Sequence, residues 1–493
     1  MLTVLFCIVN RLVYFQHWLN TSIEQMPTKD RPKNVVIIFP RFRYKSGDIP
    51  IGVASLAAFV RERIDNISLA VLDTTFSPSF SYVERFLSRR RPEIVGIFMD
   101  VLMAEDAARV AAIAKRYGAT IIAGGPHATM APEAVLAEDG FDAVCIGEGE
   151  ETFKDYIETF YGDKKFGKVK GIWFKQDGVV HKTPRRDFIE NIDTLPRPAF
   201  DMFDMERYIR IFIQMDSYDP ALRGVSLTVS RGCPYNCTFC QPTVHKTLGR
   251  KVRIRSPRSV VEDLKYLKSR YRIECFYLSD DLITVLKDWL VEFCTLLEDE
   301  RICLPWGCNT RVDTIDYDMM LMMKKAGLVK LKVGIESITE RIRNGLYNKG
   351  ISRQQILETL ANARRLDIQV TGFIMVGAPT ETAAEVWNTI RFAATSSLDE
   401  MVLSVTTPFP GSALYDYVVA KGWRLPKRFR LYNYYQVRRP RMSEDQITNT
   451  RLFVYKKVAN AYFYLHPRRI RKTIHSVMGG AWLRKLLIKL RRV

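Results

Sequence analysis

Long apolar runs are scarce in this sequence of 493 residues. The most apolar end, Met1 to Leu19, is interrupted by Arg11, Gln16 and His17. Its uninterrupted runs are therefore far shorter than the ~20 residues that a membrane-spanning helix needs. The same segment lacks a basic start and a small-residue cleavage site, which argues against a secretory signal peptide. We expect a cytoplasmic protein whose apolar N-terminal segment either packs on the fold or acts as an interfacial anchor.

A regular cysteine framework is also missing. The nine cysteines do not show the dense, even spacing of a small disulfide-bonded secreted protein. Three of them, Cys233, Cys237 and Cys240, fall within eight residues, which indicates metal binding in a reducing compartment. The other six lie mostly in apolar surroundings, where cysteine serves as a small buried hydrophobe; they are Cys7, Cys145, Cys275, Cys294, Cys303 and Cys308.

Acidic residues are absent from Arg451 to Val493. That stretch holds twelve Lys or Arg and so supplies +12 of the net charge of +20. Its last part, Ala481 to Arg492, alternates apolar and basic residues at helical spacing. Such a helix either lies in an anionic membrane surface or packs on the enzyme with a solvated basic face. Peripheral membrane contact is thus one expectation, whereas no nucleic-acid partner is expected, because no nucleic-acid module is readable.

A hydrophobic content of 47% and a charged content of 26% describe a folded globular protein, and this length predicts two or three domains. In residues 33–160, apolar β-branched runs alternate with helical stretches. Strands are expected at 35–39, 69–72, 94–98, 120–123 and 143–146, and helices near 53–63, 82–89, 104–117 and 132–138. Alternating elements with short connections predict an α/β fold with a doubly wound, Rossmann-like parallel sheet.

Three glycine-bearing loops fall at the carboxyl edge of this predicted sheet, at residues 46–52, 124–129 and 147–150. Ligands of open α/β sheets bind in the crevice at that edge. Glycine at a strand end lets the backbone approach a ligand closely. The loops alone name no ligand.

In combination, Pro50 to Ala57 and the other two loops resemble the cobalamin (B12)-binding domain that precedes many radical S-adenosylmethionine (SAM) enzymes. The resemblance implies cobalamin contacts from Gly52, Gly125, His127, Gly147 and Glu148. The Asp-x-His-x-x-Gly motif, whose histidine ligates cobalt in methionine-synthase-like domains, is absent. His127 follows Gly-Gly-Pro, so a structural role in its loop is favoured over cobalt ligation.

The three clustered cysteines follow a predicted strand at 225–230, with the spacing C-x-x-x-C-x-x-C. Thiolates suit the irons of a [4Fe–4S] cubane. Three cysteines on one loop can occupy three irons and leave the fourth open to the amino and carboxylate groups of SAM. Zinc is the rival by residue type, but it would need a fourth nearby ligand; His245, five residues past Cys240, keeps that alternative open by counting alone.

With Phe239 before the last cysteine, the motif identifies the chain as a member of the radical SAM superfamily. Further strands expected near 275–278, 304–308, 331–335, 370–376 and 401–405 complete six β/α units. They predict a partial (β/α)6 TIM-type barrel with its site at the carboxyl ends of the strands. The resemblance implies SAM contacts from Phe239, Asp280, Asp281, Arg311, Glu336, Ser337 and Gly377. Asp281 could instead cap the following helix, and Gly377 could merely shape a turn.

Ser279-Asp280-Asp281 and the ending at Thr406 to Ser412 resemble the branch that contains anaerobic magnesium-protoporphyrin ester cyclase, hopanoid methylases and other cobalamin-dependent methylases. This resemblance implies reductive cleavage of SAM to a 5′-deoxyadenosyl radical and methylation of an unactivated carbon by way of methylcobalamin. The alternative is a cyclase or another C–H functionalisation without methyl transfer. A third hypothesis is a redox or regulatory protein that holds both cofactors without turnover.

The expected organisation has five parts. They are an apolar segment (1–32), a cobalamin-binding-like domain (33–160), a connector with a β-hairpin near 171–181 (161–222), the radical SAM barrel (223–425), and a basic, partly amphipathic helical region (426–493). A small-molecule or lipid substrate and a reductant such as flavodoxin or ferredoxin are expected partners. Plausible substrate-side groups are Arg223, Tyr235, His245 and Arg250.

Overall fold

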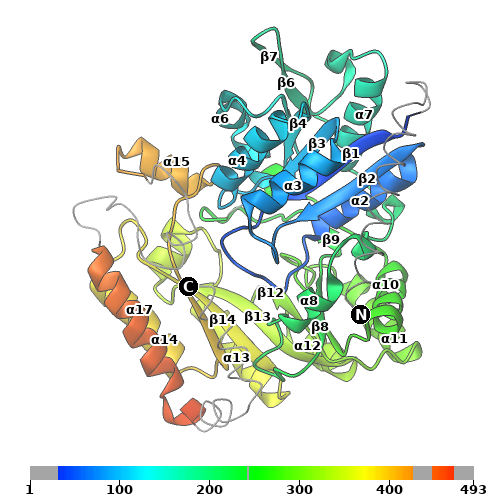
Figure 1. Ribbon diagram of the computed structural model, residues 1–493. Coiled ribbons are helices and arrows are strands. Elements are labelled where there is room, and N and C mark those ends of the chain that lie inside the picture. The colour runs from blue at the N-terminus through cyan, green and yellow to red at the C-terminus, as the bar shows by residue number, and fades with distance from the viewer. Residues whose placement is uncertain (1–30, 241–243, 426–446, 471–493) are drawn as a thin grey trace, which may run out of the picture.

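The computed structural model describes residues 31–240, 244–425 and 447–470 of the chain. Figure 1 shows two α/β units, with the N-terminal unit at the top and the strands of the second unit spread below it. A doubly wound sheet is followed by a partial barrel of parallel strands. The predicted fold class is confirmed for both units.

The N-terminal sheet has seven strands in the order β2-β1-β3-β4-β5-β6-β7. Its five parallel strands are β1 (Lys33–Phe39), β2 (Ile67–Asp73), β3 (Ile94–Phe98), β4 (Thr120–Gly124) and β5 (Ala143–Cys145). Its helices are α2 (Ile51–Arg63), α3 (Phe80–Arg90), α4 (Ala104–Lys115), α5 (Pro126–Met130), α6 (Pro132–Ala137) and α7 (Glu150–Tyr161), with a 3-10 turn η1 (Phe166–Lys168).

Helices cover both faces of this sheet, which explains the continuous apolar run of β1. Val35 and Ile37 join one hydrophobic cluster with residues of α2 and α7. Val36 and Ile38 point the other way and join a second cluster with residues of α3 and α4. A strand buried on both sides needs apolar residues at every position rather than at alternate ones.

The sheet extends beyond the expected parallel strands. The hairpin expected in the connector forms β6 (Ile172–Gln176) and β7 (Val179–Lys182), and β6 pairs antiparallel with β5. The pairing satisfies backbone groups that β5 would otherwise expose as an edge strand. Ile172 and Phe174 are buried, whereas every residue of β7 is exposed. The sheet of the N-terminal domain therefore continues past residue 160.

The second sheet contains six parallel strands in the order β15-β14-β13-β12-β11-β8. They are β8 (Gly224–Leu227), β11 (Cys275–Leu278), β12 (Trp306–Thr310), β13 (Leu328–Glu336), β14 (Gln369–Val376) and β15 (Glu400–Val405), and a short ribbon is formed by β9 (Ser230–Arg231) and β10 (Arg253–Ile254). The helices are α9 (Val244–Thr247), α10 (Pro257–Tyr271), α11 (Lys287–Asp299), α12 (Tyr317–Lys325), α13 (Arg353–Arg365), α14 (Ala383–Thr395) and α15 (Ala413–Ala420), with a π-helical turn η4 (Arg341–Leu346). The predicted six-unit partial barrel is confirmed.

The connector closes the amino-terminal side of this barrel. It contains η2 (Ile192–Thr194), η3 (Phe200–Met202) and α8 (Met205–Arg210). After α8, Phe212 and Met215 pack against Cys275 and Tyr277 of β11. Gly224 makes room for the Phe212 side chain, because a Cβ at residue 224 would lie 2.2 Å from the Phe212 ring.

Asp48, from the loop after β1, reaches into the barrel. Its carboxylate accepts hydrogen bonds from the Ser226 hydroxyl at 2.6 Å and from the Gln214 amide at 2.8 Å. The buried Lys332 of β13 donates to the Gln214 side chain. A polar group of the N-terminal domain thus completes the hydrogen bonding inside the second domain.

The described part of the C-terminal region contains α17 (Asn449–Tyr464), which packs against α14 and β15. The expectations for the N-terminal apolar segment and for the amphipathic stretch from Ala481 to Arg492 fall outside the described residues. No helix within the ranges that the structure describes is long and apolar enough to span a bilayer.

Candidate active site

The three predicted cluster ligands lie on the loop that follows β9, beyond the carboxyl end of β8. Neighbouring segments hold the backbone of this loop. The Cys233 amide donates to the Gly249 carbonyl at 3.1 Å, and the Thr238 amide donates to the Tyr347 carbonyl at 3.0 Å. Gly232 has φ +99°, a conformation that other residues rarely adopt. The loop is therefore held in shape by the protein itself.

The three cysteines form no disulfide bond with any residue that the structure describes, and their side chains are partly exposed. Within the described residues, no three His, Cys, Asp or Glu side chains converge on a point that one ion could fill, as a zinc site would require. A cubane needs no such convergence, because each cysteine binds a different iron. Burial raises the pKa of the Cys240 thiol to about 12, so iron would have to displace its proton on binding. The loop fits a cluster held by three thiolates.

Asp280 anchors the strand that leads into the loop. Its buried carboxylate accepts the Val229 amide at 2.8 Å and the amide and hydroxyl of Ser230 at 2.5 and 2.6 Å. Burial raises the pKa of Asp280 to about 6 despite these hydrogen bonds. We expected this carboxylate to contact SAM. The structure instead commits it to the protein backbone, which corrects that expectation.

Asp281 behaves differently from its neighbour. Its side chain is exposed, and no hydrogen bond to it is found among the residues that the structure describes. Surrounding protein still raises its pKa by desolvation. Burial raises the pKa of the Cys233 and Cys240 thiols, and the charge of Asp281 adds to that rise. The helix-cap alternative is wrong, because the cap of α11 is Leu286. Asp281 is therefore an exposed carboxylate near the cysteines of the cluster loop.

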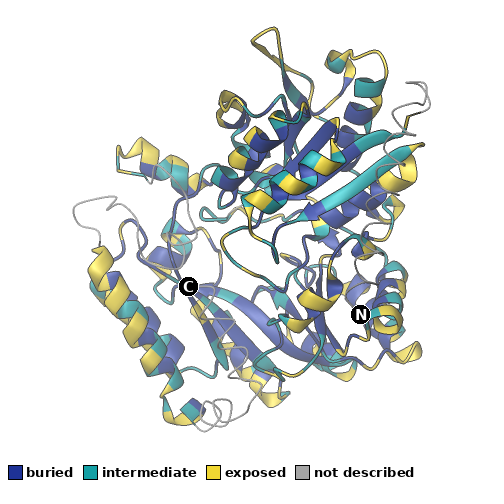
Figure 2. Cartoon of the chain, in the orientation of Figure 1, coloured by how far each residue is buried: buried dark blue, intermediate teal, exposed yellow. Residues whose placement is uncertain are grey.

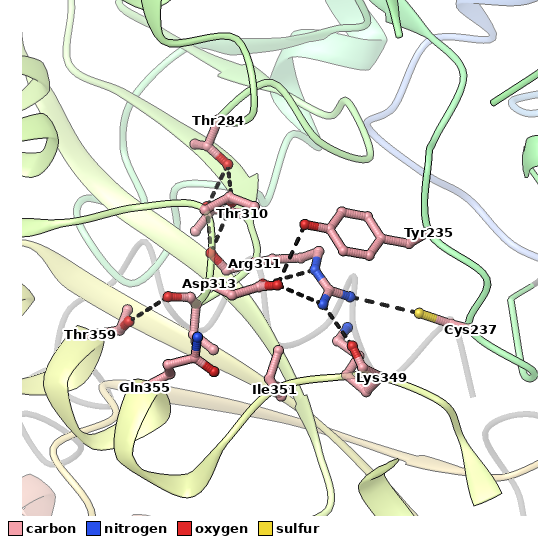
Figure 3. Close-up of polar contacts among 12 residues, drawn as sticks. Tyr235, Cys237, Thr284, Thr310, Arg311, Asp313, Lys349, Ile351, Gln355 and Thr359 are labelled. Atoms are coloured by element: carbon pink, nitrogen blue, oxygen red, sulfur yellow. Dashed lines mark hydrogen bonds and ion pairs between the residues drawn. The ribbon is translucent and has the colours of Figure 1, made fainter. Parts of the chain in front are cut away.

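Arg311, at the end of β12, reaches the cluster loop (Figure 3). Its guanidinium forms two 2.9 Å hydrogen bonds with Asp313 and a third, of 2.6 Å, with the Lys349 carbonyl. It stacks 3.6 Å from the centre of the Tyr235 ring. Nη1 lies 3.8 Å from the Cys237 sulfur. The cation is thus fixed beside a cluster ligand.

Glu336 ends β13 in a left-handed conformation, with φ +60°, and its buried carboxylate pairs with Lys349 at 3.0 Å. Gly334 makes this pair possible, because a Cβ there would lie 2.5 Å from both charged groups. The ammonium group of Lys349 lies 5.7 Å from the centre of the Phe239 ring. The structure therefore brings Glu336 and Phe239 together, with a lysine between them that the sequence analysis did not identify.

Two other expected SAM contacts point elsewhere. Ser337 is fully buried, and its hydroxyl bonds with Thr389 of α14 at 3.1 Å. A hydroxyl turned toward a helix cannot reach a ligand at the strand ends, so this expectation is not supported. Gly377 has φ +77°, and its amide donates to the Glu381 carboxylate. The turn-forming alternative is consistent with that geometry.

A cavity of about 480 Å³ lies at the carboxyl edge of the N-terminal sheet. That volume falls within the ~300–1,000 Å³ of small-molecule and cofactor sites. Of the residues expected to bind cobalamin, Gly52, Gly125, Gly147 and Glu148 line the cavity. A Cβ on Gly52 would meet nothing within 4 Å, so this position faces open space. The cavity and its glycine loops fit part of a large planar cofactor.

His127 does not line the cavity. It lies in the short helix α5, largely buried, and its Nδ1 has no hydrogen-bond partner in the described part of the chain. Burial lowers its pKa. Contact of His127 with cobalamin is therefore not supported, and the structural role is favoured.

Glu148 lines the cavity, but its carboxylate is engaged by the barrel. Oε1 accepts from Arg231 at 3.0 Å, and Oε2 accepts from Arg253 at 2.9 Å. Glu150 binds the same Arg231 at 2.5 Å. Burial alone would raise the pKa of Glu148, but Arg253 and Arg231 hold it below its usual value. A contact with cobalamin through this carboxylate is thus replaced by a link between the two domains.

The sequence analysis did not single out Arg231, Arg253 or Lys349 as site residues. The sequence signal for Arg231 was its place two residues before Cys233. Arg223 is also placed differently from the expectation. It precedes β8 and pairs with Glu206 at 2.9 Å, on the side away from the cluster loop.

Two family descriptions match the chain. The description of the radical SAM superfamily matches residues 227–393, and that of the B12 binding domain matches residues 46–157. An uncharacterized methyltransferase of Pyrococcus horikoshii is 31% identical over 434 residues, which cover 87% of this chain and 91% of that protein.

Two further relatives have named activities. The anaerobic magnesium-protoporphyrin IX monomethyl ester cyclase of Rubrivivax gelatinosus is 27% identical, covering 77% of this chain and 69% of its own length. The hopanoid C-3 methylase of Methylococcus capsulatus is 25% identical, covering 74% and 67%. Among solved structures, the radical SAM methyltransferase TsrM from Kitasatospora setae, with cobalamin and a [4Fe–4S] cluster bound, superposes with TM-score 0.66 at 15% identity, covering 80% of this chain and 76% of that one.

A three-cysteine loop above a partial barrel, joined to a sheet with a cavity at its carboxyl edge, defines a radical SAM enzyme with a B12-binding domain. The chain belongs to the radical SAM superfamily and, within it, to the family of cobalamin-dependent methyltransferases. Its cofactors are the [4Fe–4S] cluster, SAM and cobalamin.

Proposed function

We propose that this enzyme methylates an unactivated carbon of a lipid or another apolar small molecule. The observation that carries the proposal is the shared wall of the cavity. Gly52, Gly125 and Gly147 line it from the N-terminal domain, while residues 228–231 line it from the barrel and lead directly to Cys233. A cofactor at the sheet edge would therefore lie close to the cluster loop.

When bound, the cluster, SAM and cobalamin supply the radical and the transferable methyl group. The residues of the chain bind and orient these groups. Asp281 is free to accept hydrogen bonds from the amino group of SAM, and Arg311 holds positive charge beside Cys237. Apolar side chains including Phe39, Phe98 and Ile122 line the cavity and exclude water from it.

The substrate class rests on two supports. Much of the cavity wall is apolar, which suits a hydrophobic substrate or the apolar part of one. One relative carries the name hopanoid C-3 methylase, and a hopanoid is a lipid. A one-electron reductant is required for cleavage of SAM, and we propose flavodoxin or ferredoxin for that role.

The test is to incubate the anaerobically reconstituted enzyme with reductant, lipid extract and SAM carrying a deuterated methyl group. We expect 5′-deoxyadenosine together with a product that carries the label. Production of 5′-deoxyadenosine without labelled product would contradict methylation and favour the cyclase alternative, to which the cyclase relative adds weight. Absence of 5′-deoxyadenosine from the wild-type enzyme would favour a protein that holds its cofactors without turnover. Cys237→Ala is the negative control.

A further inference from the structure

Helix α17 is apolar on two opposite sides. Its inner side buries Leu452, Ala459 and Phe463 against the barrel. Its outer side exposes the large apolar side chains of Phe453 (52% exposed), Val454 (50%) and Val458 (38%), and its C-cap residue Leu465 is also exposed (62%). Figure 2 shows this helix at the periphery of the molecule with a mostly exposed outward side.

This pattern departs from that of an ordinary surface helix. The solvent side of such a helix usually carries charged and polar residues, and a helix that is apolar all round is usually buried. Four exposed apolar side chains on one face form a patch of the kind that marks an interaction surface. The patch consists of Phe453, Val454, Val458 and Leu465, and we call it the α17 face.

The charged residues around the α17 face, from residue 451 onward, are all basic, which favours an anionic partner. Lys457 lies within the face, and Arg451 and Arg468 lie near its two ends, all three exposed. No acidic residue occurs from residue 451 to the end of the sequence. A second copy docked face to face would bring like charges together. Residues 471–493 contain Lys and Arg but no acidic residue. Docked on the α17 face, that segment would also bring like charges together.

We propose that the α17 face docks on a lipid bilayer that contains anionic lipids. The apolar side chains would enter the boundary between headgroups and acyl chains, and the flanking cations would pair with anionic headgroups. An acidic protein could satisfy the cations, but it would still have to supply an apolar groove. A bilayer supplies both chemistries at once.

Docking of the α17 face on a bilayer can be measured without turnover. If the proposed lipid substrate is wrong, vesicle binding through the α17 face can still be observed. If the docking surface is wrong, a labelled product can still form in detergent solution. The two failures are therefore distinguishable.

The experiment is cosedimentation of the reconstituted enzyme with vesicles of phosphatidylcholine alone and with about one third phosphatidylglycerol. The triple variant Phe453→Ser, Val454→Ser, Leu465→Ser removes most of the α17 face. The matched control is Val179→Ser, Val180→Ser, Val291→Ser, which removes three apolar side chains that are similarly exposed on other elements. Lys457→Glu tests the charge. Circular dichroism checks that each variant is folded.

We expect the wild type and the matched control to bind anionic vesicles, and the triple variant to bind at least about tenfold more weakly. We expect Lys457→Glu to weaken binding to anionic vesicles several-fold while leaving the weak binding to neutral vesicles unchanged. A variant lacking residues 471–493 should retain binding.

Three results would overturn the proposal. The first is that the wild type does not bind anionic vesicles. Binding of an acidic protein through this helix, without binding to vesicles, counts as the same result. The second is equal binding by the triple variant and the control, or loss of binding only when residues 471–493 are removed. The third is a dimer in light scattering that the triple variant dissociates, which would assign the face to a second copy.

Discussion

Glu148 of the N-terminal domain and Arg231 of the barrel form a largely buried ion pair, with Oε1 and Nη1 3.0 Å apart. Glu150 binds the same guanidinium. Glu148 also lines the cavity, while Arg231 stands two residues before Cys233. The pair therefore ties the edge proposed for cobalamin to the loop proposed for the cluster.

Removing both carboxylates should destabilise the protein strongly. In Glu148→Gln, Glu150→Gln, the buried Arg253 and the largely buried Arg231 would keep their charges without counter-charges. Loss of a buried counter-charge typically costs about 3–5 kcal/mol. Urea denaturation of the reconstituted enzyme would measure this loss. Glu190→Gln is the control, because its pair with Lys251 is solvent-exposed and should contribute nothing measurable. Equal stability of the double variant and the wild type would show that the ion pair does not hold the domains.

Each cluster cysteine should be essential for iron binding. Cys233→Ala, Cys237→Ala and Cys240→Ala should each lower iron content and abolish formation of 5′-deoxyadenosine, because the cubane would lose one of its three protein ligands. Iron and sulfide analysis with visible absorption spectroscopy would report the change. Cys303→Ser, at an exposed cysteine, should behave as the wild type. Full iron content in any of the three alanine variants would exclude that cysteine as a ligand.

Substitutions of the adjacent residues Asp280 and Asp281 should have different effects on iron content and on SAM binding. Asp281→Asn should keep its iron content but bind SAM about tenfold more weakly, because it loses a charged hydrogen-bond acceptor. Asp280→Asn should lose iron and thermal stability, because an amide cannot accept as many hydrogen bonds from Val229 and Ser230. Calorimetric titration with SAM and iron analysis distinguish the two. The reverse pattern would show that the assigned roles are exchanged.

Lys332 should make stability depend on pH. Burial lowers its pKa from 10.5 to about 7, so between those values the unfolded chain binds more protons than the folded one. Stability due to this group therefore rises with pH across that window and is lost as the pH falls through about 7. Lys332→Met should lack this rise. Melting temperatures measured between pH 6.5 and 9 test the difference, and parallel curves for both proteins would contradict it.

Filling the cavity at Gly52 should displace cobalamin. Because a Cβ there meets nothing within 4 Å, Gly52→Leu would place its side chain in the cavity without disturbing the core. We expect corrinoid absorption bands to be reduced after reconstitution. Gly167→Leu is the matched control, since Gly167 has the same open surroundings outside the cavity. Normal retention of cobalamin by Gly52→Leu would place the cofactor elsewhere.

Local sequence pattern was sufficient for the strands and the cluster loop. Runs such as Ile94–Phe98 and Cys275–Leu278 form strands with the expected bounds, because continuous apolar β-branched and aromatic residues suit a sheet buried on both faces. The cysteine spacing was informative because three thiolates on one loop have few other uses.

Features that depend on the direction of a side chain, or on pairing between distant parts of the chain, could not be predicted from the sequence. Asp280 and Asp281 are neighbours of identical chemistry, and only the folded chain shows that Asp280 is buried against the backbone while Asp281 is exposed near the cluster loop. Glu148 meets Arg231 across 83 residues of sequence, so no local pattern links them. The hairpin at β6 and β7 was recognised, but its pairing with β5 depends on which strand edge lies nearby.

Asp48 has a consequence for how the chain is made. It precedes Ser226, its partner in the barrel, by 178 residues, so its loop leaves the ribosome well before the first barrel strand. Because domains fold from the N-terminus during synthesis, the barrel closes around a carboxylate that is already present. A chain begun at residue 161 would enclose Lys332 without that negative charge nearby. We therefore expect the barrel to be less stable without this loop, and a chimera with a foreign N-terminal domain to gain stability from an equivalent acidic residue in the loop after its first strand.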